Sequence, residues 1–376
     1  MLLSDDHRAV QEAVRQYVQA EIAPHAAAWD KSGAFPQAQL RGLAALGCYG
    51  VAVPTELDGA GLDYLALALI LEEIAAGDGA TSTVVSVTNC PVNSILMGFG
   101  NADQQERFLK PLARGDMLGA FCLTEPHVGS QADGLKTTAM RDGEDYVLNG
   151  VKQFITSGKH GDVAIVMAVT DKAAGKRGIS AFIVPTGTPG YIVARLEDKM
   201  GQHASDTAQI LFENCRVPAA NRLGEEGQGL KIALSGLEGG RIGIASQAVG
   251  MARAAFDAAL AYSKDRVTFG QPIFQHQAVQ FKLAGMATQI EAARQLIWHA
   301  ATLKDAGRPC LKEAAMAKLF ASEMAERVCS DAIQVFGGYG YVSDFPVERI
   351  YRDVRVCQIY EGTSEVQKIL IGRALA

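Results

Sequence analysis

The chain has 376 residues, of which 48% are hydrophobic, enough to build the cores of two or three domains. Its formal net charge of −6 disfavours a nucleic-acid partner. Seven scattered cysteines without a CxxC pair, and seven histidines without HxxxH or HExxH spacing, predict neither a disulfide framework nor a bound metal. No apolar run is long enough to span a bilayer and no signal peptide precedes the first helix pattern, so we expect a soluble protein of a reducing compartment.

The first hundred residues are predicted to be helical. Ser4 is placed to cap a helix that carries Val10, Val14 and Val18 on one face. Further helices are expected over residues 37–45 and 63–76, and the second of these is apolar nearly all round. Such a helix has no polar face to present to water, so we expect it to be buried.

Between residues 118 and about 225 the pattern changes to that of strands. Asn149-Gly150 lies between two strand-like runs, which predicts a tight hairpin at that dipeptide. Residues 163–169, 179–184 and 207–212 are predicted to form further strands. Five or more short strands at this spacing indicate a compact β domain, closed as a barrel. No GxGxxG fingerprint opens a helix, so a Rossmann NAD-binding fold is not expected.

After Gly229 the helical period returns, with predicted helices over residues 230–263, 277–303, 311–336 and 347–352. Small residues recur in the first of them and allow the close helix packing of a bundle or of a subunit contact.

Near the end of the chain, Glu361 precedes Gly362, which lets the backbone bend and come close to a ligand. Thr363 or Ser364 is placed to cap a last helix with an apolar face of Val366, Ile369 and Leu370. Most glutamates are solvated surface groups, so this segment alone is weak evidence for a catalytic carboxylate.

Four motifs in order strengthen that evidence. Residues 123–130, 237–241, 265–270 and 359–363 each resemble a motif of the acyl-CoA dehydrogenases, and the similarity covers about residues 4–374. The run 240–248 resembles most closely the short-chain (butyryl-CoA type) and branched short-chain members. The fold expected is mostly α with a central β domain: an N-terminal helical domain (1–117), a middle β-barrel (118–225) and a C-terminal four-helix bundle (226–376).

The resemblance implies FAD as cofactor and a homotetramer built as a dimer of dimers. Arg266, Phe269 and Gln277 match positions through which one subunit reaches the FAD of its neighbour, and an arginine beside bare backbone amides suits a pyrophosphate. Two departures from the family pattern are Phe154, where Trp is usual, and Gln131, where Asp is more common. The full set of implied cofactor contacts is Phe121, Leu123, Thr124, Gly129, Ser130, Phe154, Ile155, Thr156, Arg266, Phe269, Gln277, Gln334, Gly337, Gly338, Thr363 and Glu365.

By the same resemblance, Glu361 is the base that removes the α-proton of an acyl-CoA while the β-hydrogen leaves as hydride to flavin N5. Burial would have to raise its pKa for it to serve as such a base. The implied substrate contacts are Ser130, Glu238, Arg241 and Gly362. The product is the trans-2-enoyl-CoA, and an electron-transfer flavoprotein is the implied electron acceptor. The implied location is the bacterial cytoplasm or, as second choice, the mitochondrial matrix.

The acyl group is expected to be short, straight or branched, and uncharged. No Lys or Arg occurs between Arg41 and Arg107, the segment that helps to line the acyl pocket in this family, and an unpaired buried carboxylate would be very costly. Two other classes stay open from the sequence: a flavin oxidase or monooxygenase that uses O2 on the same fold, and a non-catalytic member that acts as an assembly protein.

Overall fold

The first helix begins where the capping pattern predicts. In the computed structural model, which describes residues 3–376, Ser4 Oγ accepts a hydrogen bond of 3.1 Å from the His7 amide. The N-terminal helices and helical turns are α1 (Asp5–Tyr17), η1 (Val18–Ile22), α2 (Ala26–Ser32), α3 (Gln37–Ala45), η2 (Thr55–Leu57), α4 (Tyr64–Gly77), α5 (Gly79–Val87), η3 (Thr88–Asn93), α6 (Ser94–Phe99), α7 (Ala102–Gln104), η4 (Gln105–Leu109) and α8 (Lys110–Arg114).

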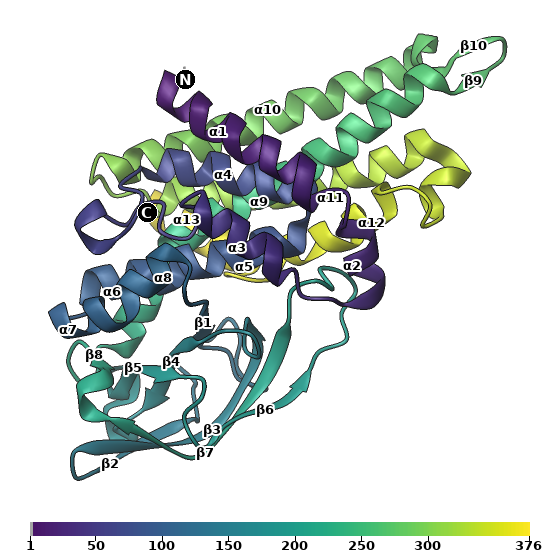
Figure 1. Cartoon of the computed structure of the whole chain (residues 1–376). Coiled ribbons are helices and arrows are strands. Elements are labelled where there is room, and N and C mark those ends of the chain that lie inside the picture. Colours follow the sequence, from purple (N-terminus) through teal and green to yellow (C-terminus); the bar gives the residue numbers. More distant parts are fainter. Residues whose placement is uncertain (1–2) are drawn as a thin grey trace.

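Helix α4 is buried along nearly its whole length, as its apolar sequence predicts. Asp63 caps its N-terminus by accepting a hydrogen bond of 2.7 Å from the Ala66 amide. Asp78 follows its last residue and caps α5 in turn, accepting from the Thr81 amide at 2.7 Å. The helix packs against α1, α5, α9 and α10, so it joins the N-terminal and C-terminal helices into one body (Figure 1).

The middle of the chain forms one eight-stranded sheet below the helices (Figure 1). Its strands are β1 (Gly119–Cys122), β2 (Thr138–Asp142), β3 (Asp145–Thr156), β4 (Val163–Val169), β5 (Ile179–Pro185), β6 (Tyr191–Leu196), β7 (Thr207–Pro218) and β8 (Arg222–Leu223), with 3-10 turns η5 (Lys172–Gly178) and η6 (Ala219–Asn221). The hydrogen-bonded order is β6-β7-β3-β2-β4-β5-β8, and β1 pairs with β4. The predicted central β domain is confirmed, with β6 and β8 at the ends of the pairing order.

The apolar run of β4 is buried on both of its faces. Ala164, Val166 and Ala168 point into a core shared by six strands, β1 to β5 and β7. Ile165 and Met167 point the other way and pack against residues of α6, α8 and α9 (Gly229–Asp265). Because side chains alternate along a strand, a continuous apolar run indicates burial on two sides. One face of the sheet thus serves the β core and the other fastens it to the helices.

The predicted hairpin at Asn149-Gly150 is wrong. Both residues lie inside β3, and the tight turn is at Gly143-Glu144, where Asp142 pairs with Asp145. Gly150, with φ of 150°, is needed for a different reason: a Cβ built on it would lie 2.6 Å from the Thr137 Cα. The glycine therefore permits a close approach of two backbones, beside a shift in register between β3 and β7.

The C-terminal part is helical, as predicted. Its elements are α9, the two-stranded ribbon of β9 (Val267–Thr268) and β10 (Gln271–Pro272), η7 (Ile273–Gln275), α10 (Gln277–Asp305), α11 (Leu311–Phe336), η8 (Gly337–Tyr341), α12 (Val347–Val354), η9 (Arg355–Gln358) and α13 (Ser364–Leu375). Helix α9 packs against α4, α10 and α11, and α9 and α10 extend side by side into an arm tipped by β9 and β10 (Figure 1). No helix within residues 3–376 is both long and apolar enough to cross a membrane.

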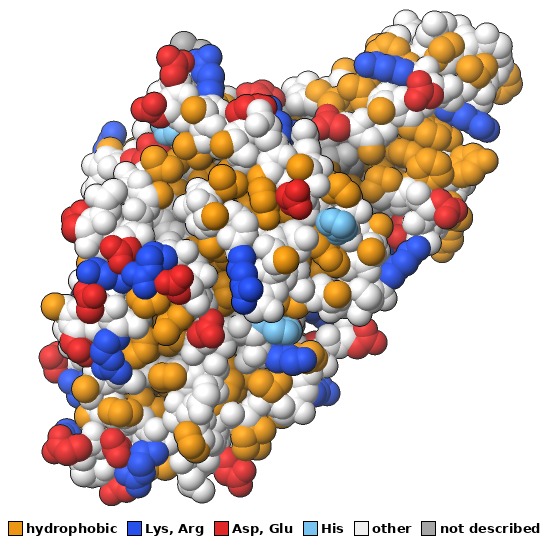
Figure 2. Space-filling model, in the orientation of Figure 1, with side chains coloured by type: hydrophobic (Ala, Val, Ile, Leu, Met, Phe, Trp, Pro, Cys, Tyr) orange, Lys and Arg blue, Asp and Glu red, His pale blue; other side chains and the backbone are white. Residues whose placement is uncertain are grey.

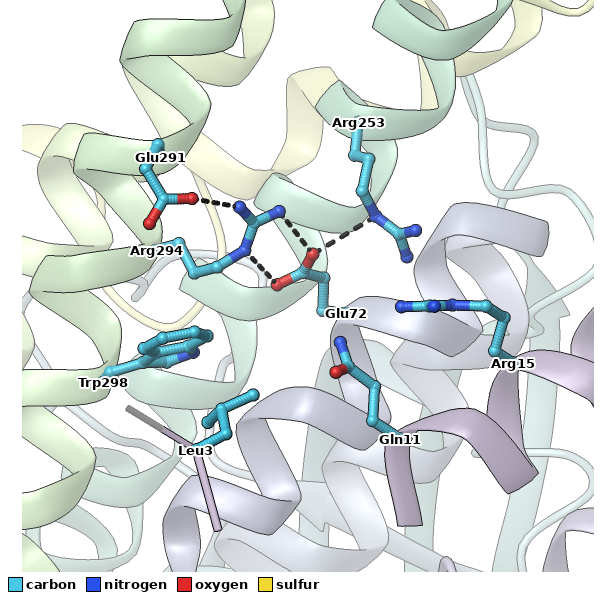
Figure 3. Close-up of a pocket in the computed structure, with 8 residues that line it drawn as sticks. All are labelled: Leu3, Gln11, Arg15, Glu72, Arg253, Glu291, Arg294 and Trp298. Atoms are coloured by element: carbon cyan, nitrogen blue, oxygen red, sulfur yellow. Dashed lines mark hydrogen bonds and ion pairs between the residues drawn. The ribbon is translucent and has the colours of Figure 1, made fainter. Parts of the chain in front are cut away.

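A network of buried charges holds α1, α4, α9 and α10 together. Glu72 of α4 accepts two hydrogen bonds from Arg294, of 2.8 and 3.1 Å, and lies 3.2 Å from Arg253 (Figure 3). Its neighbour Glu73 accepts from Arg15 at 2.8 Å and from Arg253 at 2.6 Å. Each buried carboxylate therefore has two arginine partners, which offsets the cost of removing it from water.

We expect Arg294→Met to lower the free energy of unfolding by about 3 kcal/mol, because it leaves Glu72 buried with one weaker partner. The matched control is Glu291→Gln, which removes the exposed partner of the same guanidinium and should change stability by less than about 1 kcal/mol. Urea denaturation followed by circular dichroism measures both. Equal midpoints for the two variants would contradict this account of the network.

Candidate active site

Glu361 lies on the turn between η9 and α13, in a backbone conformation that is unusual for a residue with a side chain. Its φ is 51°, and Gly362 continues the left-handed turn with a φ of 94°. Residues other than glycine adopt such φ values at an energetic cost, and they cluster at functional sites. The expected bend is thus present, and Glu361 itself takes part in it.

The Glu361 carboxylate is pressed against helix α9. A Cβ built on Gly240 would lie 1.9 Å from Glu361 Oε2, so only a glycine leaves room for the carboxylate at this point of the helix. Oε2 is buried and has no hydrogen-bond partner among the residues described. Burial raises the pKa of Glu361 to about 7, against the opposing attraction of Arg241 and Lys318.

Arg241, one residue further along α9, is the second buried charge of the site. Only 4% of it is exposed, and its Nε and Nη1 atoms lack a hydrogen-bond partner within residues 3–376. Burial lowers its pKa, while Glu361 and Glu238 act in the opposite direction. The structure therefore brings Glu361 and Arg241 together, and both keep hydrogen-bonding capacity that a ligand could use.

Glu238 makes its hydrogen bonds to other groups than Glu361 and Arg241. Its Oε1 accepts from Lys304 Nζ at 3.3 Å and from Cys310 Sγ at 3.5 Å. Helix positions two residues apart face different directions, which explains why Gly240 faces Glu361 and Glu238 does not.

The turn that carries Glu361 is held by residues that the sequence did not single out. Lys318 Nζ of α11 donates to the Gly362 carbonyl oxygen at 2.7 Å, and Gln367 Nε2 of α13 donates to the same oxygen at 2.8 Å. Thr363 caps α13 by accepting from the Val366 amide at 3.4 Å. One signal was available for Lys318: it lies between alanines at positions 314, 317 and 321, on the stripe that becomes the buried face of α11.

Helix α13 buries a different face from the one expected. Its predicted apolar face carries Ile369, which is 51% exposed, whereas Ser364 and Gln367 are buried. Glu365, an implied cofactor contact, is exposed in the first turn. On this face Gln367 donates hydrogen bonds to the Glu361 turn, so a polar residue is buried there.

Behind Glu361, a buried polar network connects the three parts of the chain. Tyr360 donates to Gln247 Oε1 at 2.5 Å, and the Gln247 amide group donates to Thr83 of α5. Thr83 in turn donates to Gln202 Oε1, in the loop before β7, at 2.7 Å. Tyr360 is thus tied to the N-terminal helices and to the sheet. Every member has a partner, and such satisfied networks make the local geometry unique.

The two segments expected to face the flavin are joined directly. The backbone amide of Gln153 donates to the Thr124 carbonyl oxygen at 2.9 Å. Lys152, fully buried, donates to the Leu123 carbonyl oxygen at 3.1 Å and to Glu125 Oε1 at 2.8 Å. The Glu125–Lys152 pair, which the sequence analysis missed, therefore fixes the start of the 123–130 loop against β3.

These segments present a surface that fits a planar aromatic ring. Phe154 has a φ of 60° at a shift in strand register and is 62% exposed. Thr124, Gly129, Ser130 and Thr156 are also exposed or half-buried. An aromatic side chain that is displayed on strained backbone, with hydroxyl groups nearby, suits an isoalloxazine ring.

Three other implied contacts are placed differently. Leu123 and Ile155 direct their side chains into apolar cores, so only their backbone groups could face the cofactor. Phe121 is half-buried at the edge of the core under the helices.

The remaining implied cofactor residues gather at the other end of the protomer. Arg266, Gly337 and Gly338 line one groove of about 570 Å³ between the end of α9 and the end of α11. Gly337 has a φ of 62°, and nothing lies within 4 Å of a Cβ built on either glycine. A guanidinium beside accessible backbone of this kind fits a pyrophosphate.

Phe269, on the turn between β9 and β10, is 98% exposed with a φ of 51°. Gln277 and Gln334 are exposed as well. Figure 2 shows hydrophobic side chains gathered on this arm, which points away from the sheet in Figure 1. One protomer therefore displays the two halves of the implied cofactor site at separate places.

Three family models together match nearly the whole chain: Acyl-CoA dehydrogenase, N-terminal domain (residues 4–116), middle domain (120–215) and C-terminal domain (227–376). The chain is 46% identical to the mitochondrial short-chain specific acyl-CoA dehydrogenase of Rattus norvegicus over 369 residues, which cover 98% of this chain and 90% of that protein.

Two solved structures are similar over their whole length. Butyryl-CoA dehydrogenase from Megasphaera elsdenii superposes with a TM-score of 0.98 at 44% identity, covering 100% of this chain and 99% of that one. A chain from a structural study of the electron transferring flavoprotein of Acidaminococcus fermentans gives the same TM-score, identity and coverage.

We expect Gly240→Ala to slow anaerobic bleaching of the bound flavin by acyl-CoA by about 100-fold, because the new methyl group displaces the Glu361 carboxylate and small misplacements of reacting groups have effects of that order. The matched control is Gly285→Ala on α10, where nothing lies within 4 Å of the added Cβ and the rate should not change. A Gly240→Ala variant that bleaches at the wild-type rate would show that Glu361 does not depend on this contact.

Proposed function

The chain belongs to the acyl-CoA dehydrogenase family, and we propose that it oxidises a short straight- or branched-chain acyl-CoA to the trans-2-enoyl-CoA with Glu361 as the α-proton base. It is an oxidoreductase that acts on a CH–CH bond, and members of the family are FAD-binding flavoproteins. The single observation that carries the proposal is the Glu361 Oε2 atom, which is buried without a hydrogen-bond partner within residues 3–376 and lies on the segment that matches the family.

The environment of Glu361 suits a base that works near neutral pH. A carboxylate with an ordinary pKa is a weak base, whereas one with a pKa of about 7 is both ionised and basic at that pH. In the proposed reaction Glu361 takes the proton from the carbon next to the thioester carbonyl. The Glu361 backbone amide is assigned to the thioester oxygen, where negative charge develops. FAD, when bound, supplies the acceptor for the hydride that leaves the β-carbon.

Binding of FAD is proposed to need two copies of the chain. The flavin ring is assigned to Thr124, Ser130 and Phe154 of one protomer, and the pyrophosphate to Arg266 with Gly337 of another. This division is supported by the separation of the sheet and the arm in Figure 1, and by the fully exposed Phe269 at the arm's tip. The proposed assembly is a homotetramer, a dimer of dimers, as the family resemblance implies.

The similarity to known family members also supports proposals for the electron acceptor, the domain boundaries and the location. An electron-transfer flavoprotein fits the similarity to a chain studied with the flavoprotein of Acidaminococcus fermentans. The domain boundaries are placed at residues 117/118 and 225/226, close to where the family models end and begin. The bacterial cytoplasm is favoured over the mitochondrial matrix, although the mitochondrial relative aligns with 98% of this chain.

A panel of acyl-CoA thioesters with an artificial electron acceptor tests the proposed substrate. We expect butyryl-CoA or isobutyryl-CoA to have a higher kcat/KM than glutaryl-CoA. No Lys or Arg occurs between Arg41 and Arg107, and Lys304 is already paired with Glu238, so a distal carboxylate has no free cation in these segments. Preferred turnover of glutaryl-CoA would overturn the assignment, and turnover with O2 alone would favour an oxidase.

The role of Glu361 is tested by Glu361→Gln. This variant should keep FAD and bind acyl-CoA but lose proton abstraction, with flavin bleaching slowed by at least about 10²–10⁴-fold. Glu238→Gln is the matched control, because Glu238 contacts Lys304 and not Glu361, and it should bleach far faster than Glu361→Gln. The opposite order of rates would show that the base is misassigned.

A further inference from the structure

We infer that Lys318 is a positioning residue for the reaction: its buried ammonium group holds the turn that carries Glu361 and keeps the Glu361 carboxylate ionised. This inference deepens the proposed function and rests on Glu361 being the base.

The geometry places Lys318 directly beneath the turn. Its side chain is fully buried in α11, and its Nζ donates to the Gly362 carbonyl oxygen at 2.7 Å. Gln367 donates to the same oxygen from α13 at 2.8 Å, and to the Glu361 carbonyl oxygen at 3.3 Å. Two donors from two helices therefore hold consecutive carbonyl groups of a left-handed turn. They differ in one respect, because Lys318 is charged and Gln367 is not.

A lysine is an expensive choice for a purely structural donor. An ammonium group has three N–H donors and loses much hydration on burial, whereas a neutral amide such as Gln367 makes the same hydrogen bond without a charge. Burial lowers the pKa of Lys318 to about 8, so the group is still charged at neutral pH. Because Lys318 Nζ contacts the carbonyl oxygen of the residue next to Glu361, this charge lies close to the carboxylate that the reaction requires.

The charged surroundings of both groups come from four helical elements and η3. Glu361 faces Arg241 of α9, Lys318 of α11 and the thiol of Cys90 in η3. Lys318 faces Glu361, Arg241, Glu365 of α13 and the Cys357 thiol of η9. Both thiols have pKa values raised by burial, so they are neutral near pH 7. Arg241 and Lys318 are therefore the two cations that oppose the effect of burial on Glu361.

Burial and nearby cations act on the pKa of Glu361 in opposite directions. Burial favours the protonated form of Glu361, and a nearby cation favours the ionised form. Removing the charge of Lys318 should raise the pKa of Glu361 above its value of about 7, so that less of the base is ionised at neutral pH. Removing the hydrogen bond of Gln367 disturbs the same turn but leaves the charge in place.

The test compares Lys318→Met with Gln367→Met. Each is purified with FAD, and the second-order rate of anaerobic flavin bleaching by sub-saturating butyryl-CoA is measured from pH 5.5 to 9.5. For Lys318→Met we expect the midpoint of the rising limb to move about one pH unit higher, the lower end of what an opposite charge nearby produces. Its deficit against the wild type should then be about tenfold at pH 6 and shrink as the pH rises.

Gln367→Met is expected to lose rate by the same factor at every pH, with an unchanged midpoint. Lys318→Gln keeps the inference testable if Lys318→Met misfolds, because it retains a donor for the Gly362 oxygen while removing the charge. It should show the same shift with a smaller loss of rate.

An unchanged midpoint in both Lys318 variants would overturn the inference and leave Lys318 as a structural donor only. Failure of the proposed function is distinguishable from failure of this inference. If the proposed function is wrong, no acyl-CoA bleaches the wild-type enzyme, or Glu361→Gln bleaches normally. Both results are seen before any Lys318 variant is compared.

Discussion

The contact between the Glu361 carboxylate and Gly240 is the constraint on which the active site depends. A turn after η9 and the middle of helix α9 are far apart in sequence, and they approach so closely that any side chain at position 240 would overlap Oε2. Close approach removes water from the carboxylate, and removal of water is what raises its pKa. Gly240 is therefore as necessary to the environment of the carboxylate as Glu361 itself.

The buried charges of this protein fall into two kinds. Glu72 and Glu125 have arginine or lysine partners at hydrogen-bond distance, and they join helices or fix a loop. The Glu361 Oε2 atom and Arg241 are buried as well, yet Oε2 and two nitrogens of Arg241 lack hydrogen-bond partners in the part of the chain that the structure describes. Unsatisfied groups of this kind are costly, and they persist where a ligand completes them. The paired charges stabilise the fold, whereas the groups without partners are available to a ligand.

Two exposed aromatic residues indicate contacts beyond a single protomer. Phe154 and Phe269 both have left-handed backbone and both display their rings to solvent, one on the sheet and one at the tip of the arm. Neither position is explained by packing within one protomer. Both are explained if a flavin covers the first and a second copy of the chain covers the second, as proposed above.

The sequence by itself determined what depends on local periodicity and capping. The helices over Gln37–Ala45 and Leu311–Phe336 and the strand Val163–Val169 lie where their patterns predict, and Ser4 and Thr363 cap the helices they precede. The order of the helical and β parts was also predicted correctly, and motifs whose residues are close in sequence singled out Glu361 and Arg241 as candidates.

Only the tertiary structure decided what depends on contacts between distant segments. Gly150 has the sequence signal of a turn, but it lies within a strand, where a glycine is needed because Thr137 passes too close for a side chain. Lys318 and Gln367 look like ordinary helix residues until α11 and α13 bring them to one carbonyl oxygen. The buried face of α13 is polar for the same reason. A local pattern reports the conformation a segment prefers, whereas such positions are set by the backbone that packs against them.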